Sequence, residues 1–257
     1  MRKLSFAAAA IACLLSASGA AEAKTLGIVA LLANDALNID VIAGATEAAK
    51  AAGWDVKVID TQASADKANA AMNTLAVEHV DAIFVLAFAS SSIGSGLEAA
   101  RQAHIPVATW GGELVPGIVV TTSGQQVGDE SAPFLLSKVG DSADVLALTF
   151  HPGKLCIDRG VAFENAVKDK PDIHVTYSEV TVPGQVQSGN ALAQAWLTTH
   201  PAGGDRKLGI WSCWDEPTTG AVAALRQAGR TDVVISSING SPQALQMVKD
   251  GDMTATT

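Results

Sequence analysis

The sequence predicts an α/β protein with two similar lobes, each containing a doubly wound parallel sheet. From Thr25 onward, short runs rich in Val, Ile and Leu alternate with longer Ala-rich stretches that carry charges at helical spacing. This alternation is typical of repeated βα units. The apolar runs are nearly continuous, as expected of parallel strands buried between two layers of helices. The pattern restarts near residue 144, which indicates a second lobe.

The first lobe is expected over residues 24–121 and the second over residues 122–252, starting with a hinge. In the first lobe we predict strands at residues 26–31, 55–60, 81–86 and 105–110, and helices at 39–52, 64–78 and 91–104. Between the halves we predict a fifth strand at 117–122 and a helix at 125–139. In the second lobe we predict strands at 144–150, 174–180, 207–213 and 232–237, and helices at 158–168, 188–199, 218–228 and 242–249.

One short internal similarity supports the repeat. Residues 97–104 resemble residues 222–229, and each segment lies between two predicted strands. Position and sequence therefore agree, although Ala-rich helices also resemble one another by chance.

The first residues predict export. Met1-Arg2-Lys3 precedes an apolar run over residues 4–15, and small residues then lead to Ala21-Glu22-Ala23. This order is typical of a cleaved secretory signal, which we assign to residues 1–23 and which predicts a periplasmic protein. The run is shorter than the roughly 20 residues of a membrane-spanning helix. A lipoprotein would instead be acylated at Cys13, but residues 10–12 lack the usual Leu.

Charge and motifs exclude several classes of protein. The formal net charge of -9 and the lack of Lys/Arg clusters argue against a nucleic-acid partner or an anionic membrane surface. The sequence contains no Gly-x-Ser-x-Gly elbow, no phosphate-binding Gly loop and no His-Glu-x-x-His zinc pair. We therefore predict no catalytic residues, no metal and no cofactor.

Ligand sites in open α/β sheets lie outside the carboxyl ends of the strands. Two such edges that face each other form a cleft, so the loops of interest are those that follow each strand. In the mature chain, Cys156 follows the first strand of the second lobe and Cys213 ends the third. In a 2-1-3-4 strand order these strands are neighbours, so a disulfide between two cleft loops is plausible. Two unpaired buried cysteines are the alternative.

Several motifs resemble those of one family. Arg159-Gly160 with Phe163 resembles an arginine motif that clamps ligand, and Asp215-Glu216 resembles an Asp-centred helix start. Further matching segments are Ala43-Gly44-Ala45, Gly53-Trp54-Asp55-Val56, Ile105-Pro106-Val107, Ser123 with Gly128, and Asn239-Gly240. Together they resemble the ribose-binding family of periplasmic sugar receptors, which has the type I periplasmic binding protein fold.

The resemblance implies a set of ligand-binding residues between the lobes. They are Asp35, Asn38, Phe88, Trp110, Arg159, Trp214, Asp215 and Asn239. Trp214 stands where the family usually has Asn, and Asn239 where Asp is common. These departures favour a smaller or less hydroxylated ligand, or one stacked on indole. Structural roles remain open: Asp35, Asn38 and Asp215 could cap helices or lie in loops, and Trp214 could pack in the core.

The resemblance also implies a function. We expect a monomeric binding component of an ABC importer that binds a small sugar or polyol and delivers it to an inner-membrane permease. A receptor of the same fold that feeds a chemoreceptor or sensor kinase is the alternative, and a cleft hydrolase is a distant third. A repressor of this fold would begin with a helix-turn-helix module, where this chain has a signal sequence. Residues 253–257 resemble the start of the strand that returns to the first lobe, so we expect a truncated C-terminus and an exposed apolar face on that lobe.

Overall fold

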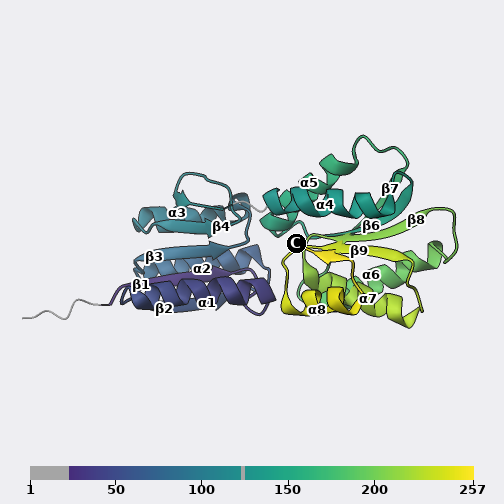
Figure 1. The fold of residues 1–257 in the computed structure, drawn as a ribbon. Helices are drawn as coiled ribbons and strands as arrows, with labels where there is room; N and C mark the ends of the chain where they lie inside the picture. The colour runs from purple at the N-terminus through teal and green to yellow at the C-terminus, as the bar shows by residue number, and fades with distance from the viewer. Residues whose placement is uncertain (1–22, 123–124) are drawn as a thin grey trace, which may run out of the picture.

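Two lobes lie end to end in the computed structural model, which describes residues 23–122 and 125–257 (Figure 1). The predicted signal sequence, apart from its last residue, and Ser123 lie outside the described residues. Each lobe contains one five-stranded sheet in which all paired strands are parallel. This confirms the predicted two-lobed α/β fold.

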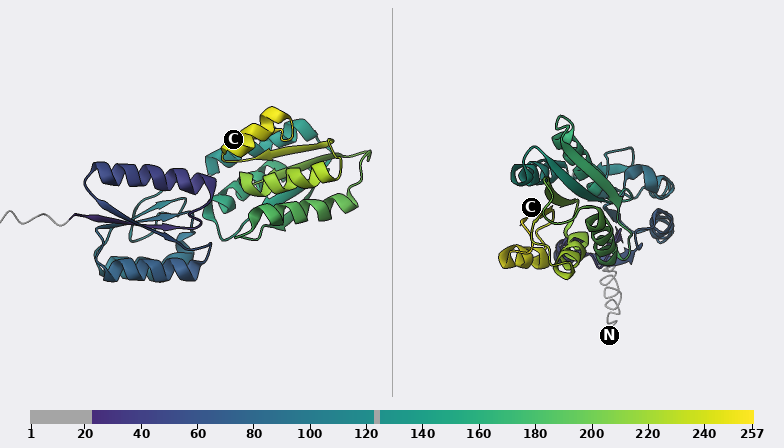
Figure 2. Two further views of the ribbon diagram at one scale, coloured as in Figure 1. Left: turned by 90° about the horizontal axis from the view of Figure 1, so that it is seen from below. Right: turned by 90° about the vertical axis from the view of Figure 1, so that its right-hand side faces the viewer.

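The first sheet has the strand order β2-β1-β3-β4-β5. Figure 2 shows helices on both of its faces, with α1 on one side and α2 on the other. The strands are β1 (Thr25–Ala30), β2 (Asp55–Asp60), β3 (Ala82–Leu86), β4 (Val107–Trp110) and β5 (Ile118–Val120). The helices are α1 (Ala36–Ala51), α2 (Ala65–Val77) and α3 (Gly94–Gln102), with a short 3-10 turn η1 (Ser90–Ile93) before α3.

The second sheet repeats this order as β7-β6-β8-β9-β10. Its strands are β6 (Ala143–Thr149), β7 (Ile173–Glu179), β8 (Lys207–Ser212), β9 (Val233–Ser237) and β10 (Ala255–Thr256). The helices are α4 (Gln125–Val139), α5 (Lys154–Val167), α6 (Gln185–Thr199), α7 (Asp215–Gln227) and α8 (Pro242–Asp250). Residues 253–257 include β10, which pairs with β9 at the edge of the second sheet.

The two similar segments noted in the sequence occupy equivalent places. Helix α3 joins the third strand of the first lobe to the fourth, and α7 does the same in the second lobe. After each helix, the backbone turns through a left-handed residue, His104 with φ 58° and Gly229 with φ 63°. The likeness between residues 97–104 and 222–229 therefore reflects the same helix followed by the same turn.

Burial follows from position in the sheet. The central strands β1, β6 and β8 are almost entirely buried. The edge strand β2 has a largely exposed pattern, because only one side of it meets a neighbouring strand. In the second lobe, the Trp211 ring stacks on Phe163 at a centroid distance of 4.5 Å, and its indole N–H donates to Ser131 at 3.2 Å. The buried indole thus has a polar partner as well as apolar packing.

The first lobe has an apolar groove beside α1. Its volume is about 410 Å³, and it lies over residues of β1, β3, β4 and β5, with Trp54 and the alanines of α1 along one side. In the second lobe, α4 packs on α5 and on β8 and β9. Strands β3 and β4 correspond to β8 and β9, so the groove lies where the first sheet would have a helix equivalent to α4.

Within the described part of the chain, none of the helices has the length and apolar character needed to cross a membrane.

Helices α6 and α7 cross so closely that two glycines are required at the contact. A Cβ atom on Gly220 would lie 1.9 Å from the Val186 carbonyl oxygen, and one on Gly189 would lie 2.0 Å from the Pro217 oxygen. Backbone atoms cannot move aside as a flexible side chain can. The crossing therefore requires glycine on both helices.

Gly220→Ala is expected to destabilise the protein by about 3 kcal/mol or more, because overpacking against backbone forces the helices apart. Gly44→Ala is the matched control, since no atom lies within 4 Å of its added Cβ in α1. That change should be neutral or stabilise by up to about 1 kcal/mol. Urea unfolding measures both variants, and equal stability of the two would contradict the close crossing.

Candidate functional site

The lobes face each other across the carboxyl ends of their strands and are in contact. The Lys154 amide donates to the Ala87 carbonyl at 2.9 Å, and Phe88 forms an antiparallel bridge with Gly153. The Ala36 amide also donates to Glu216 Oε1 at 3.2 Å, from the first lobe to the second. These contacts define a closed arrangement.

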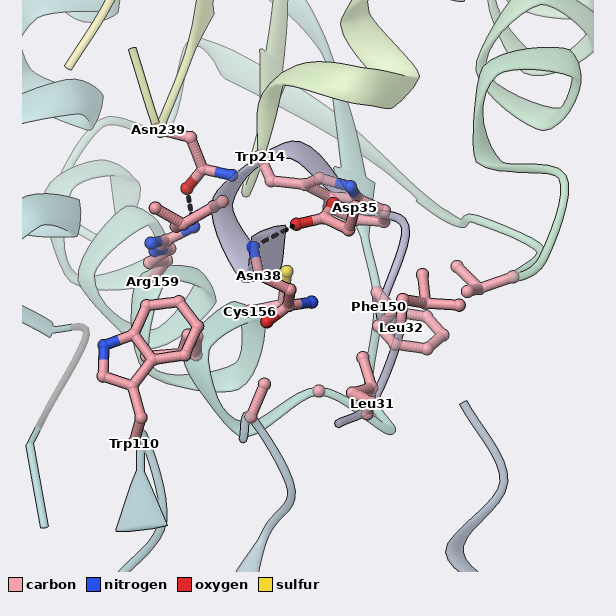
Figure 3. Close-up of a pocket in the computed structure, with 15 residues that line it drawn as sticks. Leu31, Leu32, Asp35, Asn38, Trp110, Phe150, Cys156, Arg159, Trp214 and Asn239 are labelled. Atoms are coloured by element: carbon pink, nitrogen blue, oxygen red, sulfur yellow. Dashed lines mark hydrogen bonds between the residues drawn. The ribbon is translucent and has the colours of Figure 1, made fainter. Parts of the chain in front are cut away.

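A cavity of about 60 Å³ lies between the lobes (Figure 3). Six of the eight predicted ligand residues line it: Asp35, Asn38, Trp110, Arg159, Trp214 and Asn239. The rest of the lining is mainly apolar and comprises Leu31, Leu32, Leu37, Ala87, Phe150, Gly153, Leu155, Cys156 and Val182. Both lobes contribute, so a molecule in the cavity would contact both.

Arg159 provides the positive charge of the cavity. It projects from α5, is only 5% exposed, and its Nη1 donates to the Cys213 carbonyl at 2.6 Å and to Asn239 Oδ1 at 3.0 Å. Its Nε has no hydrogen-bond partner among the described residues. Burial lowers the pKa of Arg159 to about 10, opposed by nearby carboxyl groups. Because that value lies well above neutral pH, the guanidinium remains charged and keeps a free donor.

Asp35 and Asn38 combine a capping role with a place on the cavity wall. Asp35 is the N-cap of α1, and its Oδ1 accepts from the Asn38 amide at 3.2 Å. The side-chain oxygen of Asn38 is buried and has no partner among the described residues. Asp35 thus binds only the backbone N–H of Asn38, and the side-chain amide of Asn38 is left available to a ligand.

Two indoles and a phenyl ring form the apolar walls. Trp110 ends β4 and is half-buried, whereas Trp214 is the N-cap residue of α7 and is 6% exposed. The Trp214 ring packs against Phe150 at a centroid distance of 5.7 Å. The prediction did not include Phe150, although it follows β6 at the same edge of the sheet. Strand-end position was the signal that could have identified it.

The structure does not place Asp215 or Phe88 on the cavity wall. Asp215 is fully buried, and its carboxylate accepts from Ser237, from Thr256 at 2.7 Å and from the Ser241 amide at 2.7 Å. These contacts fix the ends of β9 and β10, and Asp215 is the first residue of α7 rather than its N-cap.

Phe88 is 2% exposed and packs in the hydrophobic core, although its backbone bridges to Gly153. The residue before it, Ala87, lines the cavity in its place.

Two residues of the cavity wall have unusual backbone conformations. Ala87 has φ 65° and Asn239 has φ 129°, both in the region that favours glycine. Each is held by contacts: the Ala87 carbonyl accepts from Lys154, and the Asn239 amide donates to Thr257 at 2.8 Å. Strained backbone of this kind, at about 1–3 kcal/mol per residue, concentrates at ligand sites.

Glu216 was not predicted as a site residue. It follows Asp215 on α7 and reaches the first lobe, where it accepts from Ala36. Burial, followed by the negative charge of Asp35, raises the pKa of Glu216 to about 8. The sequence Asp215-Glu216 showed two carboxyl groups at this helix start, but it does not show which of them faces the other lobe.

Cys156 and Cys213 form a disulfide with Cα atoms 5.2 Å apart. The bond links the first turn of α5 to the residue after β8. Arg159 lies almost one turn beyond Cys156, and its guanidinium binds the Cys213 carbonyl. The disulfide therefore fixes both the helix that carries the arginine and one of its acceptors.

The cavity can bind a small polar molecule by hydrogen bonds and ring packing. It offers the Arg159 and Asn239 groups from one lobe and the Asp35 and Asn38 groups from the other. Among the described residues, no group of three or more His, Cys, Asp or Glu side chains could hold a metal ion.

Comparison with known proteins agrees with this geometry. A family model described as "Periplasmic binding protein domain" matches residues 27–257. The chain belongs to this family of periplasmic binding proteins. The match covers both lobes of the binding protein, including every residue of the cavity wall.

Individual relatives are similar over nearly the whole binding protein. The ribose import binding protein RbsB of Escherichia coli is 28% identical over 261 residues, which cover 100% of this chain and 86% of the relative. A solute-binding protein of an ABC transporter from Agrobacterium vitis, solved with bound allitol, is 28% identical with a TM-score of 0.81, covering 90% of this chain and 80% of that one. An ABC sugar transporter subunit from Rhodobacter sphaeroides is 25% identical with a TM-score of 0.81, covering 89% and 82%.

Replacement of both cysteines by serine is expected to destabilise the binding protein by about 4 kcal/mol, the chain-entropy value for a loop of this length. The loop is long, with a sequence separation of 57. Denaturant unfolding of the double variant, compared with wild type in oxidised and reduced form, measures the change. Reduction should lower the stability of the wild type and leave the variant unaffected. Unchanged wild-type stability on reduction would contradict a structural disulfide.

Proposed function

We propose that this protein is the periplasmic substrate-binding component of an ABC importer and that it binds a small sugar or polyol in the inter-lobe cavity. One observation carries the proposal: a buried arginine with a free donor, flanked by two tryptophans, lies between two closed lobes. Hydroxyl oxygens accept from the guanidinium, and the apolar faces of sugars and polyols pack on indole. The relatives named for ribose and for bound allitol support this class of ligand.

The lining favours a ligand with few hydroxyl groups. Apart from the two indoles and a cysteine, the wall has four polar side chains, and two of them, Arg159 and Asn239, are already hydrogen-bonded to each other. The other eight wall residues are apolar or glycine. Buried polar groups reject ligands that leave them unpaired, and apolar walls disfavour hydroxyls that find no partner. A tetritol, a pentitol or a deoxypentose therefore fits better than a fully hydroxylated hexose.

Lobe closure is the mechanism of capture. In the open state the cavity residues of each lobe face water, and ligand stabilises the closed state by bridging Asn38 of the first lobe and Arg159 of the second. The ligand shifts the equilibrium only through its stronger binding to the closed form. An inner-membrane permease would then recognise the surface that closure assembles from both lobes. The predicted signal sequence supports a periplasmic location for this cycle, and we propose that the protein acts there as a monomer.

A ligand panel tests the proposal. Thermal shift followed by calorimetry should be carried out with tetritols, pentitols, inositols, pentoses, deoxypentoses and hexoses. We expect at least one polyol or small sugar to raise Tm and to bind with micromolar Kd or tighter, with hexoses weaker. No stabilisation by any of them would contradict the sugar or polyol assignment.

Arg159→Lys is expected to weaken binding of the best ligand by about 30-fold or more. A lysine cannot bind Cys213, Asn239 and ligand together, because it lacks the planar fork of donors. Loss of one such contact typically amounts to 2–5 kcal/mol. Arg101→Lys is the matched control, since Arg101 is exposed on α3 and its guanidinium, among the residues that the structure describes, binds only Glu98. Calorimetry of both variants makes the test, and equal affinity would exclude Arg159 from the ligand site.

A further inference from the structure

The contact between Glu216 and the first lobe contains an unsatisfied polar atom. Glu216 Oε1 accepts from the Ala36 amide at 3.2 Å. Its other oxygen, Oε2, is buried and has no hydrogen-bond partner among the described residues. A buried carboxylate oxygen without a donor is unfavourable, because nothing replaces its lost hydration.

A second carboxyl group lies beside Glu216 and makes its buried negative charge still less favourable. Asp35 is 7% exposed and directly precedes Ala36, whose amide binds Glu216. After burial, the negative charge of Asp35 is the main cause that raises the pKa of Glu216. Two adjacent carboxylates in a buried site favour a shared proton. A proton on Glu216 would convert its unsatisfied oxygen into a donor, with the Asp35 carboxylate as acceptor.

We propose that Glu216 carries a proton when the lobes are closed and donates it in a hydrogen bond to Asp35, so that this pair is a proton-dependent latch across the cleft. Asp35 lies at the start of α1 in the first lobe, and Glu216 lies on α7 in the second. Closure therefore creates the contact, and opening returns both groups to water. Closure takes up one proton, and opening releases it.

Other charged groups surround the pair. From α5, the Arg159 guanidinium interacts with both carboxyl groups and also with Asp158, and Asp215 precedes Glu216 on α7. The Lys154 ammonium lies against Asp158 and is 3.8 Å from Glu113 Oε1 of the first lobe. Arg159 keeps its charge through this pH range, because burial lowers its pKa only to about 10. Of Arg159 and Glu216, Glu216 is therefore the group whose pKa, about 8, lies in the neutral-to-alkaline range.

The sign of the pH dependence follows from the pKa of Glu216. Exposed to water in the open form, the group should titrate near its ordinary value of 4.5, whereas in the closed form its pKa is about 8. Below 4.5 both forms are protonated and closure is fully favoured. Between pH 4.5 and about pH 8, only the closed form holds the proton. Rising pH therefore lowers the closed-to-open ratio, by up to tenfold per pH unit. Above about 8 the latch is lost.

The experiment needs no ligand, so its outcome is independent of the proposed function. Small-angle X-ray scattering gives the closed fraction of the full chain, without ligand, between pH 6 and pH 9. We expect the wild type to be mainly closed at pH 6, with a closed-to-open ratio at least tenfold lower at pH 9. Glu216→Gln keeps an acceptor for Ala36 and a donor for Asp35 at every pH, so its ratio should change less than threefold.

Two further variants complete the test. Glu47→Gln removes an exposed carboxyl from α1 and should behave as the wild type. Glu216→Ala removes donor and acceptor together and should be open at both pH values, while circular dichroism checks that it remains folded. The same pH dependence in the wild type and Glu216→Gln would overturn the proposal. A wild type that is open, or closed, at every pH would also overturn it.

Discussion

Arg159 places a charged guanidinium at a position that is 5% exposed, and the surroundings compensate for its burial. The carboxyl groups of Asp215, Asp35 and Asp158 all favour the charge. Two acceptors, the Cys213 carbonyl and Asn239, bind it directly. A buried charge without such partners would cost several kcal/mol. The acidic residues come from both lobes, so the arginine links the lobes electrostatically as well as forming part of the cavity.

The guanidinium of Arg159 also connects the disulfide to the cavity, because it binds the carbonyl of Cys213. The Cys156–Cys213 bond holds the start of α5 against the end of β8, which is the contact that the guanidinium completes. Asp215 is used differently, since its oxygens bind Ser237, Ser241 and Thr256 and thereby order the loop that carries Asn239. The cavity is thus preorganised by covalent and hydrogen-bonded supports behind its wall.

Much of this architecture could be predicted from the sequence. Nearly continuous Val, Ile and Leu runs identified the buried parallel strands, and their restart identified the second lobe. The carboxyl-end rule then located the cleft, and six of the eight predicted residues line the cavity. The resemblance between residues 97–104 and 222–229 agreed with the position of each segment between two strands, and the structure shows that α3 and α7 are equivalent.

The remaining features depended on geometry that a linear pattern does not contain. Successive residues at a helix start point in different directions, so Asp215 faces inward to β9 and β10 while Glu216 reaches the first lobe. Phe88 and Ala87 alternate in the same way after β3, and the strand-end rule does not say which one faces the cleft. The pairing of β10 with β9 could not be predicted, because two residues carry too little pattern to assign a strand to a sheet.

The most direct measurement is a crystal structure of the protein with the polyol or small sugar that stabilises it best. We expect one ligand molecule between the closed lobes, with a hydroxyl within hydrogen-bond distance of Arg159, another near Asn38, and an apolar edge against Trp110 or Trp214. A ligand that contacts only one lobe, or that binds outside this cavity, would contradict this expectation.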